Sequence, residues 1–162
     1  VEPEVLMDGD HSIDRCYEVS SAALKSLFAA METRGVNVKG TILKPNMVTA
    51  GSLCESQASI VEVAEMTVRC LQENVPSDLP GITFLSGGQS DLNSTAHLDA
   101  MNKIGGFPWK LSFSYGRALQ QAALKSWLGK IENMPSAQAA LSHRALMNKL
   151  AAQGAWSSDL EG

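Results

Sequence analysis

Apolar residues along this chain fall into two kinds of run, short continuous runs and longer runs with helical spacing. The short runs lie at residues 1–6, 40–44, 82–86 and 109–114. A polar or glycine-containing loop follows each of them, and then apolar residues recur three or four positions apart, as on one face of an amphipathic helix. The pattern therefore predicts four strand–loop–helix units and one further helix at the end.

The predicted helices begin and end at residue types that usually mark helix ends. They cover roughly residues 12–34, 59–74, 91–103, 117–128 and 136–152. We expect Ser90 to cap the third helix at its start and Gly35 to end the first helix in a left-handed conformation. The final residues, 157–162, are expected to fray.

Strands that alternate with helices indicate an α/β fold with parallel strands joined by right-handed crossovers. A complete TIM (β/α)8 barrel needs about 250 residues, whereas this chain has 162. We therefore expect half of such a barrel, with four parallel strands and flanking helices, or a smaller open sheet. Val1 is not a methionine and lies inside a predicted strand, so we also expect the chain to be part of a larger protein.

The composition is that of an ordinary globular protein, with 44% hydrophobic and 19% charged residues. A net charge of -4 predicts no nucleic-acid partner. No apolar run approaches the roughly 20 residues of a membrane span, so no membrane partner is expected. Cys16, Cys54 and Cys70 form no C-x-x-C pair, which favours free thiols and a reducing cytoplasmic location.

Polar residues of functional type occur in or just after all four predicted strands. They are Glu2 and Glu4, Lys44, Ser86 with Gly87 and Gly88, and Ser114 with Gly116 and Arg117. In a barrel the carboxyl ends of parallel strands converge on one rim, where such folds keep their active sites. A single lysine at a strand end is usually only a solvated charge, and a Gly-Gly pair is usually only a turn. Their occurrence at all four strands favours a functional site.

Imine formation is the chemistry that uses these groups together. The Lys44 amine would attack a ketone and lose water, and the resulting iminium would accept electrons during carbon–carbon cleavage. Glu2 and Glu4 are candidates to transfer protons. Because nearby carboxylates favour the charged ammonium, we expect an apolar pocket or a second cation to oppose them, and Arg117 would be occupied by phosphate, so such a cation would lie outside these residues. Backbone amides near Gly87 and Gly116, with the Arg117 guanidinium, would hold the phosphate of a keto sugar.

Four motifs, in the same order, resemble class I fructose-1,6-bisphosphate aldolase. They are VEPEVL with DGDH at residues 1–11, GTILKPNMV at 40–48, FLSGGQS at 84–90 and WKLSFSYGRAL at 109–119. The resemblance implies that residues 1–155 are half of a single TIM-barrel catalytic domain, strands five to eight, and that 156–162 are a C-terminal tail. The N-terminal half of the barrel, with its catalytic aspartate, lysines and arginine, has no counterpart in this sequence.

The same resemblance implies a role for each candidate residue. Lys44 matches the Schiff-base lysine, Glu2 the acid/base of the dehydration step, and Glu4 the carboxylate that holds the active-site lysines. The phosphate-binding positions are matched by Ser86, Gly87, Gly116 and Arg117, with Ser114 nearby. The family cleaves fructose 1,6-bisphosphate to dihydroxyacetone phosphate and glyceraldehyde 3-phosphate in glycolysis, without a metal or other cofactor, usually as a homotetramer.

Other kinds of function are less consistent with the sequence. His11, His97 and His143 are scattered, which disfavours a zinc-dependent aldolase. Two alternatives stay open. One is a non-catalytic half-barrel that serves as a binding or assembly module, and the other is a Schiff-base aldolase for another phosphosugar.

Overall fold

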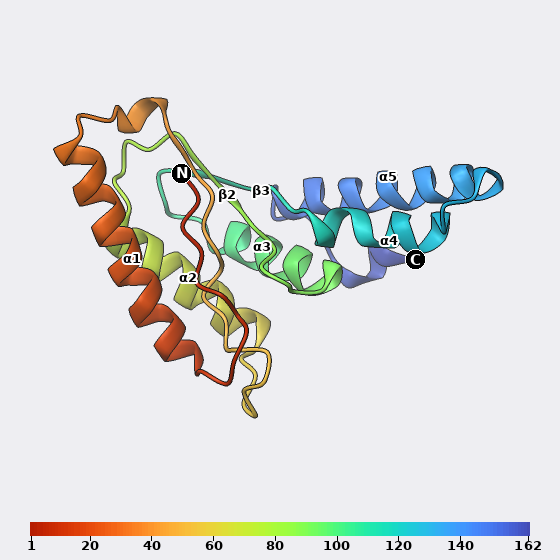
Figure 1. Ribbon diagram of the computed structural model, residues 1–162, viewed down its shortest axis with the longest axis horizontal. Coiled ribbons are helices and arrows are strands. Elements are labelled where there is room, and N and C mark those ends of the chain that lie inside the picture. The colour runs from red at the N-terminus through yellow and green to blue at the C-terminus, as the bar shows by residue number, and fades with distance from the viewer.

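Short parallel strands alternate with α-helices in the computed structural model, which describes residues 1–162 (Figure 1). The elements, in chain order, are α1 (Ile13–Thr33), β1 (Ile42–Leu43), α2 (Ile60–Asn74), β2 (Gly81–Phe84), α3 (Asp91–Ile104), β3 (Lys110–Phe113), α4 (Arg117–Trp127) and α5 (Met134–Ala151). Short 3-10 helices lie at Val38–Gly40, Ile131–Asn133 and Ser158–Glu161. The fold class is α/β, as the alternating pattern predicted.

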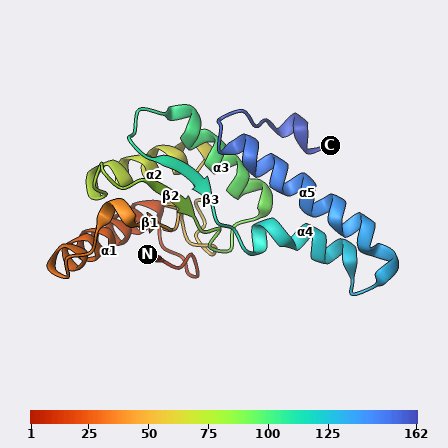
Figure 2. The ribbon, with the colours of Figure 1, turned by 90° about the horizontal axis from the view of Figure 1, so that it is seen from above.

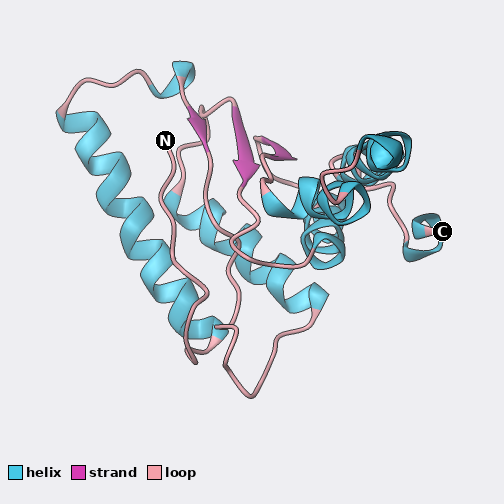
Figure 3. Ribbon diagram, turned by 45° about the vertical axis from the view of Figure 1, so that its right-hand side comes forward, coloured by secondary structure: helices cyan, strands magenta, loops and turns pink.

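The sheet has three strands in the order β1-β2-β3, all parallel. The fourth strand predicted at residues 1–6 is not confirmed, since this segment is drawn as an extended loop in Figure 3. Val1 does make both ladder hydrogen bonds with the β1 chain, to Ile42 O and from Lys44 N, each at 2.8 Å. The next donor in the ladder would be residue 3, which is a proline and has no N–H, so the pairing stops there.

One face of the sheet is buried against helices and the other is more open. Leu43, Ile82 and Phe84 are completely buried on the helix side, where they form the core with residues of α1, α2 and α3. On the other face, Ile42 is exposed and Thr83 is half-buried. Figure 2 shows α1, α2 and α3 following one another around the sheet. None of the helices is both long and apolar enough to cross a membrane.

Serine caps set the start of the first three helices. The side chains of Ser12, Ser59 and Ser90 each accept a hydrogen bond from the backbone N–H three residues later. This confirms the predicted cap at Ser90. At the end of α1, Gly35 has a φ of 65°, as expected for a left-handed position that glycine favours.

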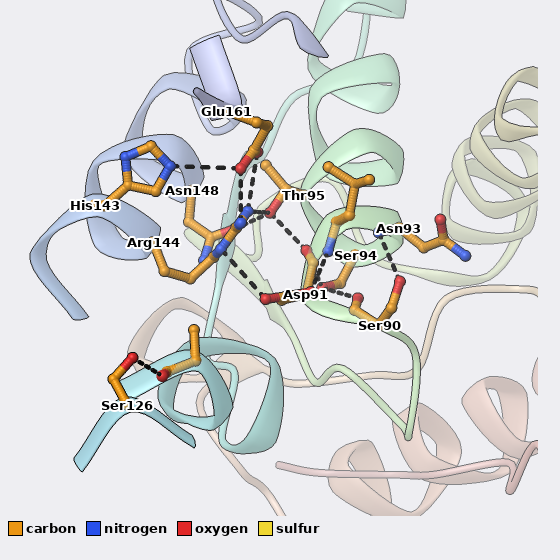
Figure 4. Close-up of polar contacts among 12 residues, drawn as sticks. Ser90, Asp91, Asn93, Ser94, Thr95, Ser126, His143, Arg144, Asn148 and Glu161 are labelled. Atoms are coloured by element: carbon orange, nitrogen blue, oxygen red, sulfur yellow. Dashed lines mark hydrogen bonds and ion pairs between the residues drawn. The ribbon is translucent and has the colours of Figure 1, made fainter. Parts of the chain in front are cut away.

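Helices α4 and α5 form an antiparallel pair that extends away from the sheet (Figure 1). The residues after α5 turn back and pack against the molecule instead of fraying, so that expectation is wrong. Glu161 accepts two hydrogen bonds from the Arg144 guanidinium, at 2.7 and 3.0 Å (Figure 4). It accepts a third from Trp156 Nε1 at 2.8 Å. A bidentate arginine–carboxylate pair beside a buried tryptophan is strong enough to order a short terminal segment.

Candidate active site

Lys44 follows β1 directly, and its side chain forms an ion pair with Glu2. The distance from Lys44 Nζ to Glu2 Oε1 is 2.7 Å, and the two side chains are 30% and 56% exposed. The amine is therefore shielded on one side by the protein and open to a substrate on the other. The structure thus brings together the predicted nucleophile and the predicted proton donor.

The hydrogen bonds of Val1 explain why these two side chains meet. They place Val1 opposite Leu43 in a parallel register, so Glu2 comes next to Lys44. Leu43 is fully buried toward the helices, and successive side chains of an extended chain alternate between faces. Lys44 consequently points to the open face of the sheet.

Asn46 holds the first segment in place where the ladder ends. Its Oδ1 accepts a hydrogen bond from Val5 N at 2.9 Å, and its Nδ2 donates to Ser20 Oγ at 3.1 Å and to Met47 O at 3.0 Å. The side chain therefore connects the residue-1–6 segment to α1. Asn46 is not among the candidates from the sequence, although its place two residues after Lys44 in the GTILKPNMV motif was a usable signal.

Glu4, the second candidate carboxylate, does not join the ion pair. Its side chain is exposed, and the ion pair of Lys44 is made with Glu2. The geometry therefore supports a direct proton-transfer role for Glu2 and leaves the role of Glu4 as a prediction.

The segment after β2 forms a tight glycine turn at the neighbouring strand end. Leu85 N donates to Pro45 O at 3.0 Å, so the turn begins beside the residue that follows Lys44. Gln89 N donates to Ser86 O at 3.0 Å and closes it. Gly87 and Gly88 have φ values of 58° and 89°, which side chains other than glycine rarely adopt. We call residues 86–89 the glycine turn.

Arg117, the first residue of α4, lies over the glycine turn. A Cβ atom built on Gly88 would be 3.7 Å from Arg117 Nη2 and 3.5 Å from Met7 Sδ. The arginine is exposed and makes no ion pair with a carboxylate of this chain. A free guanidinium above backbone amides is a favourable arrangement for a phosphate.

Gly116 begins α4 without a side-chain cap, which leaves the helix start open. Its carbonyl accepts the N–H groups of Leu119 and Gln120, both at 3.1 Å. The earlier N–H groups of a helix have no partner inside it and attract anions. Ser114, exposed at the end of β3, lies next to β2, because its N–H donates to Phe84 O at 2.9 Å.

Buried Tyr115 fixes the loop between β3 and α4. Its hydroxyl donates to Ser94 O in α3 at 2.8 Å, and its ring packs against Phe113 with centroids 5.5 Å apart. Burial raises the pKa of the Tyr115 hydroxyl far above its usual value, so it stays protonated and remains a donor. Helix α3 therefore supports the loop that carries Gly116 and Arg117.

The geometry defines a rim with two parts, an amine with a carboxylate and a turn with a free guanidinium. This combination suits a phosphorylated carbonyl substrate that reacts through an imine. No group of three or more histidine, cysteine, aspartate or glutamate side chains is arranged to hold a metal ion.

Comparison with known proteins gives the family. The model of the fructose-bisphosphate aldolase class I family matches residues 1–162. The chain belongs to this family.

Several members of the family are closely similar in sequence and structure. A probable class 1 fructose-bisphosphate aldolase of Xanthomonas campestris is 58% identical over 96% of this chain and 47% of its own length. A chloroplastic fructose-bisphosphate aldolase of Chlamydomonas reinhardtii is 51% identical over 100% of this chain and 43% of its own. The solved structure of the Plasmodium falciparum aldolase, in complex with TRAP and an inhibitor, superposes with a TM-score of 0.95 at 46% identity, over 98% of this chain and 46% of that one. The chain thus spans about half the length of these relatives.

Proposed function

We propose that this chain is the carboxyl-terminal half of a class I fructose-1,6-bisphosphate aldolase barrel, with Lys44 as its covalent nucleophile. The observation that carries the proposal is the Lys44 amine, 2.7 Å from Glu2 Oε1 at the end of β1. Residues 1–155 would form strands five to eight of a (β/α)8 barrel, and 156–162 the C-terminal tail. The open face of the sheet and the half-length match to the relatives support this assignment.

The reaction would begin when the uncharged Lys44 amine attacks the C2 ketone of the substrate. A carbinolamine forms, and Glu2 protonates its hydroxyl, which leaves as water. The Glu2 carboxylate then takes the proton of the C4 hydroxyl, and the electron pair of the breaking C3–C4 bond moves to the iminium, so glyceraldehyde 3-phosphate leaves and an enamine remains. Protonation of the enamine carbon and hydrolysis of the imine then release dihydroxyacetone phosphate and restore Lys44.

The phosphate near the reacting ketone would be held by the glycine turn and the start of α4. Ser86 and Gly87 would contribute polar groups from the turn, and Ser114, Gly116 and Arg117 would contribute from the loop after β3. The Arg117 side chain over Gly88 supports this arrangement. A phosphate held in this way would orient the neighbouring ketone toward Lys44. Orientation of the reacting groups is a large part of the rate gain in such reactions.

The proposal also covers the cofactors, assembly and location of the whole protein. Because the iminium itself accepts electrons, the reaction requires no metal or other cofactor from these residues. We propose a homotetramer as the assembled form. A cytoplasmic location fits the three cysteines, none of which forms a disulfide.

A steady-state assay with the full-length protein tests the proposal. We expect cleavage of fructose 1,6-bisphosphate in the presence of excess EDTA, and a loss of about 10³-fold or more in kcat for Lys44→Met. Higher turnover of a different phosphosugar would favour the second aldolase alternative. Absence of turnover on any phosphosugar would favour the non-catalytic module.

A further inference from the structure

His97, on α3, contacts the glycine turn through a side chain that takes no part in the proposed chemistry. The residue is 5% exposed, and its Nδ1 lies 2.6 Å from Gln89 Oε1. The other end of the Gln89 amide, Nε2, lies 3.5 Å from Met47 Sδ. The last residue of the turn is therefore held between α3 and the chain that follows β1.

The chemistry of the two side chains fixes which atom donates. An amide oxygen can only accept, so the proton must be on His97 Nδ1. Burial lowers the pKa of His97 to about 4, so the ring is neutral near physiological pH. His97 is thus a neutral donor of fixed tautomer directed at Gln89.

The glycine turn has few other restraints. Gly87 and Gly88 have no side chains, and both occupy the left-handed region. One backbone hydrogen bond, from Gln89 N to Ser86 O, closes the turn, and another, from Leu85 N to Pro45 O, holds the residue just before it. The contact of Gln89 Oε1 with His97 adds a side-chain restraint that ties the last residue of the turn to α3.

We propose that His97 is a positioning residue for phosphate binding, which acts through Gln89 to hold the amides of the glycine turn in the orientation that receives the anion. The inference rests on the proposed function, because it assigns a support to that site. His97 touches no reacting atom, so it affects substrate binding and leaves the chemical step unchanged.

The neighbouring polar residue Asn102 offers a matched comparison on the same helix. Its Nδ2 donates to Leu98 O at 3.0 Å and to Ala151 O at 3.2 Å, so it faces α5 and not the glycine turn. Its loss would weaken the packing of α3 without touching Gln89.

The test uses the full-length protein with the substitutions His97→Leu, His97→Asn and Asn102→Ala. For His97→Leu we expect the KM for fructose 1,6-bisphosphate and the inhibition constant of inorganic phosphate to rise together, about 5- to 10-fold, with kcat within about 2-fold of wild type. His97→Asn keeps an N–H donor near the position of Nδ1 and should restore both constants. Asn102→Ala should lower the melting temperature and leave both constants unchanged.

Two results would overturn the inference. One is a His97→Leu variant with unchanged KM and phosphate inhibition. The other is an equal rise in both constants for Asn102→Ala, because a general loss of stability would then explain the effect. In either case wild-type turnover persists, whereas failure of the proposed function would remove turnover from the wild type itself.

Discussion

At the scale of single residues, the candidate site depends on the hydrogen bonds of Val1, because they place Glu2 beside Lys44. The two ladder bonds with Ile42 and Lys44 set the register that brings Glu2 to the lysine amine. Pro3 then ends the ladder, and Asn46 replaces the missing strand contacts with side-chain hydrogen bonds. The carboxylate is therefore held by backbone geometry, although it is 56% exposed in this chain.

The substitution Glu2→Gln tests whether the Glu2 carboxyl supplies a proton during turnover. The amide keeps the shape of the side chain but cannot give a proton to the carbinolamine, so we expect kcat to fall by about 10²-fold or more. The KM should change little, because phosphate contacts are untouched. Steady-state kinetics of the full-length protein measures both constants.

Glu18→Gln provides the control for that measurement. Glu18 is an exposed residue of α1 that pairs only with Arg15, at 2.9 Å. Its substitution should leave kcat unchanged. Equal kcat values for wild type and Glu2→Gln would show that another group supplies the proton.

At the scale of elements, helix α3 supports both halves of the candidate phosphate site. It accepts the Tyr115 hydroxyl at Ser94 O, and it presents His97 to the glycine turn. On its other side, Thr95 Oγ1 accepts a hydrogen bond from Arg144 Nη1 at 3.2 Å, and Arg144 also binds Glu161 (Figure 4). The terminal residues and the candidate phosphate site therefore share one supporting helix.

The pairing of Glu161 with Arg144 predicts a pH-dependent contribution to stability. Partial burial alone would raise the pKa of Glu161, but hydrogen bonds from Arg144 and Trp156 outweigh it and lower the pKa. A carboxyl with a lowered folded-state pKa adds stability that is full above its unfolded pKa, about 4.3, and is lost as the pH falls through the folded value. We expect Glu161→Gln to lower the free energy of unfolding by about 1–3 kcal/mol at pH 7, with a smaller difference below about pH 4.

Denaturant unfolding of the full-length protein at several pH values measures that difference. Asp159→Asn is the matched control, since it removes the same charge from an exposed residue of the same short helix. Its effect should be within about 0.5 kcal/mol at every pH. An equal loss for both variants would indicate a general charge effect and no specific pairing.

The same elements show what sequence patterns could and could not predict. Apolar periodicity located all five helices, because burial on one face imposes the spacing. It failed at residues 1–6, where Pro3 removes one donor, and at the C-terminal end, where a partly buried ion pair with Arg144 holds Glu161. Their places in or after the predicted strands, and the motifs, predict Lys44, Glu2 and Arg117 as site residues, and the structure brings the first two together. Asn46 was missed because its contacts with Val5 and Ser20 are distant in sequence. His97 was missed because its contact with Gln89 depends on how the turn after β2 folds back onto α3.

At the scale of the whole molecule, the structure has surfaces that a complete barrel would cover. The outer edge of β3 is unpaired, and only Val1 pairs with the outer edge of β1. Leu124 on α4, and Leu128 and Ile131 in the connection to α5, are 57%, 69% and 77% exposed. Open strand edges and exposed apolar side chains favour association with other chains. These features support the proposal that a second half-barrel completes the fold.

We therefore expect the purified 162-residue chain to self-associate and to show no cleavage activity. Sedimentation velocity at several concentrations should show species larger than 17.3 kDa. A well-behaved monomer across the concentration series would contradict the proposal that these surfaces are normally covered. Turnover by the isolated chain would contradict the view that its site is incomplete.

Covalent trapping of the imine tests the role of Lys44 most directly. Reduction with borohydride in the presence of dihydroxyacetone phosphate converts an imine to a stable secondary amine, and peptide mass spectrometry locates it. In the full-length protein we expect one adduct per chain, on the peptide that contains Lys44, and none in Lys44→Met. An unmodified Lys44, or an adduct at a different lysine, would contradict the proposed mechanism.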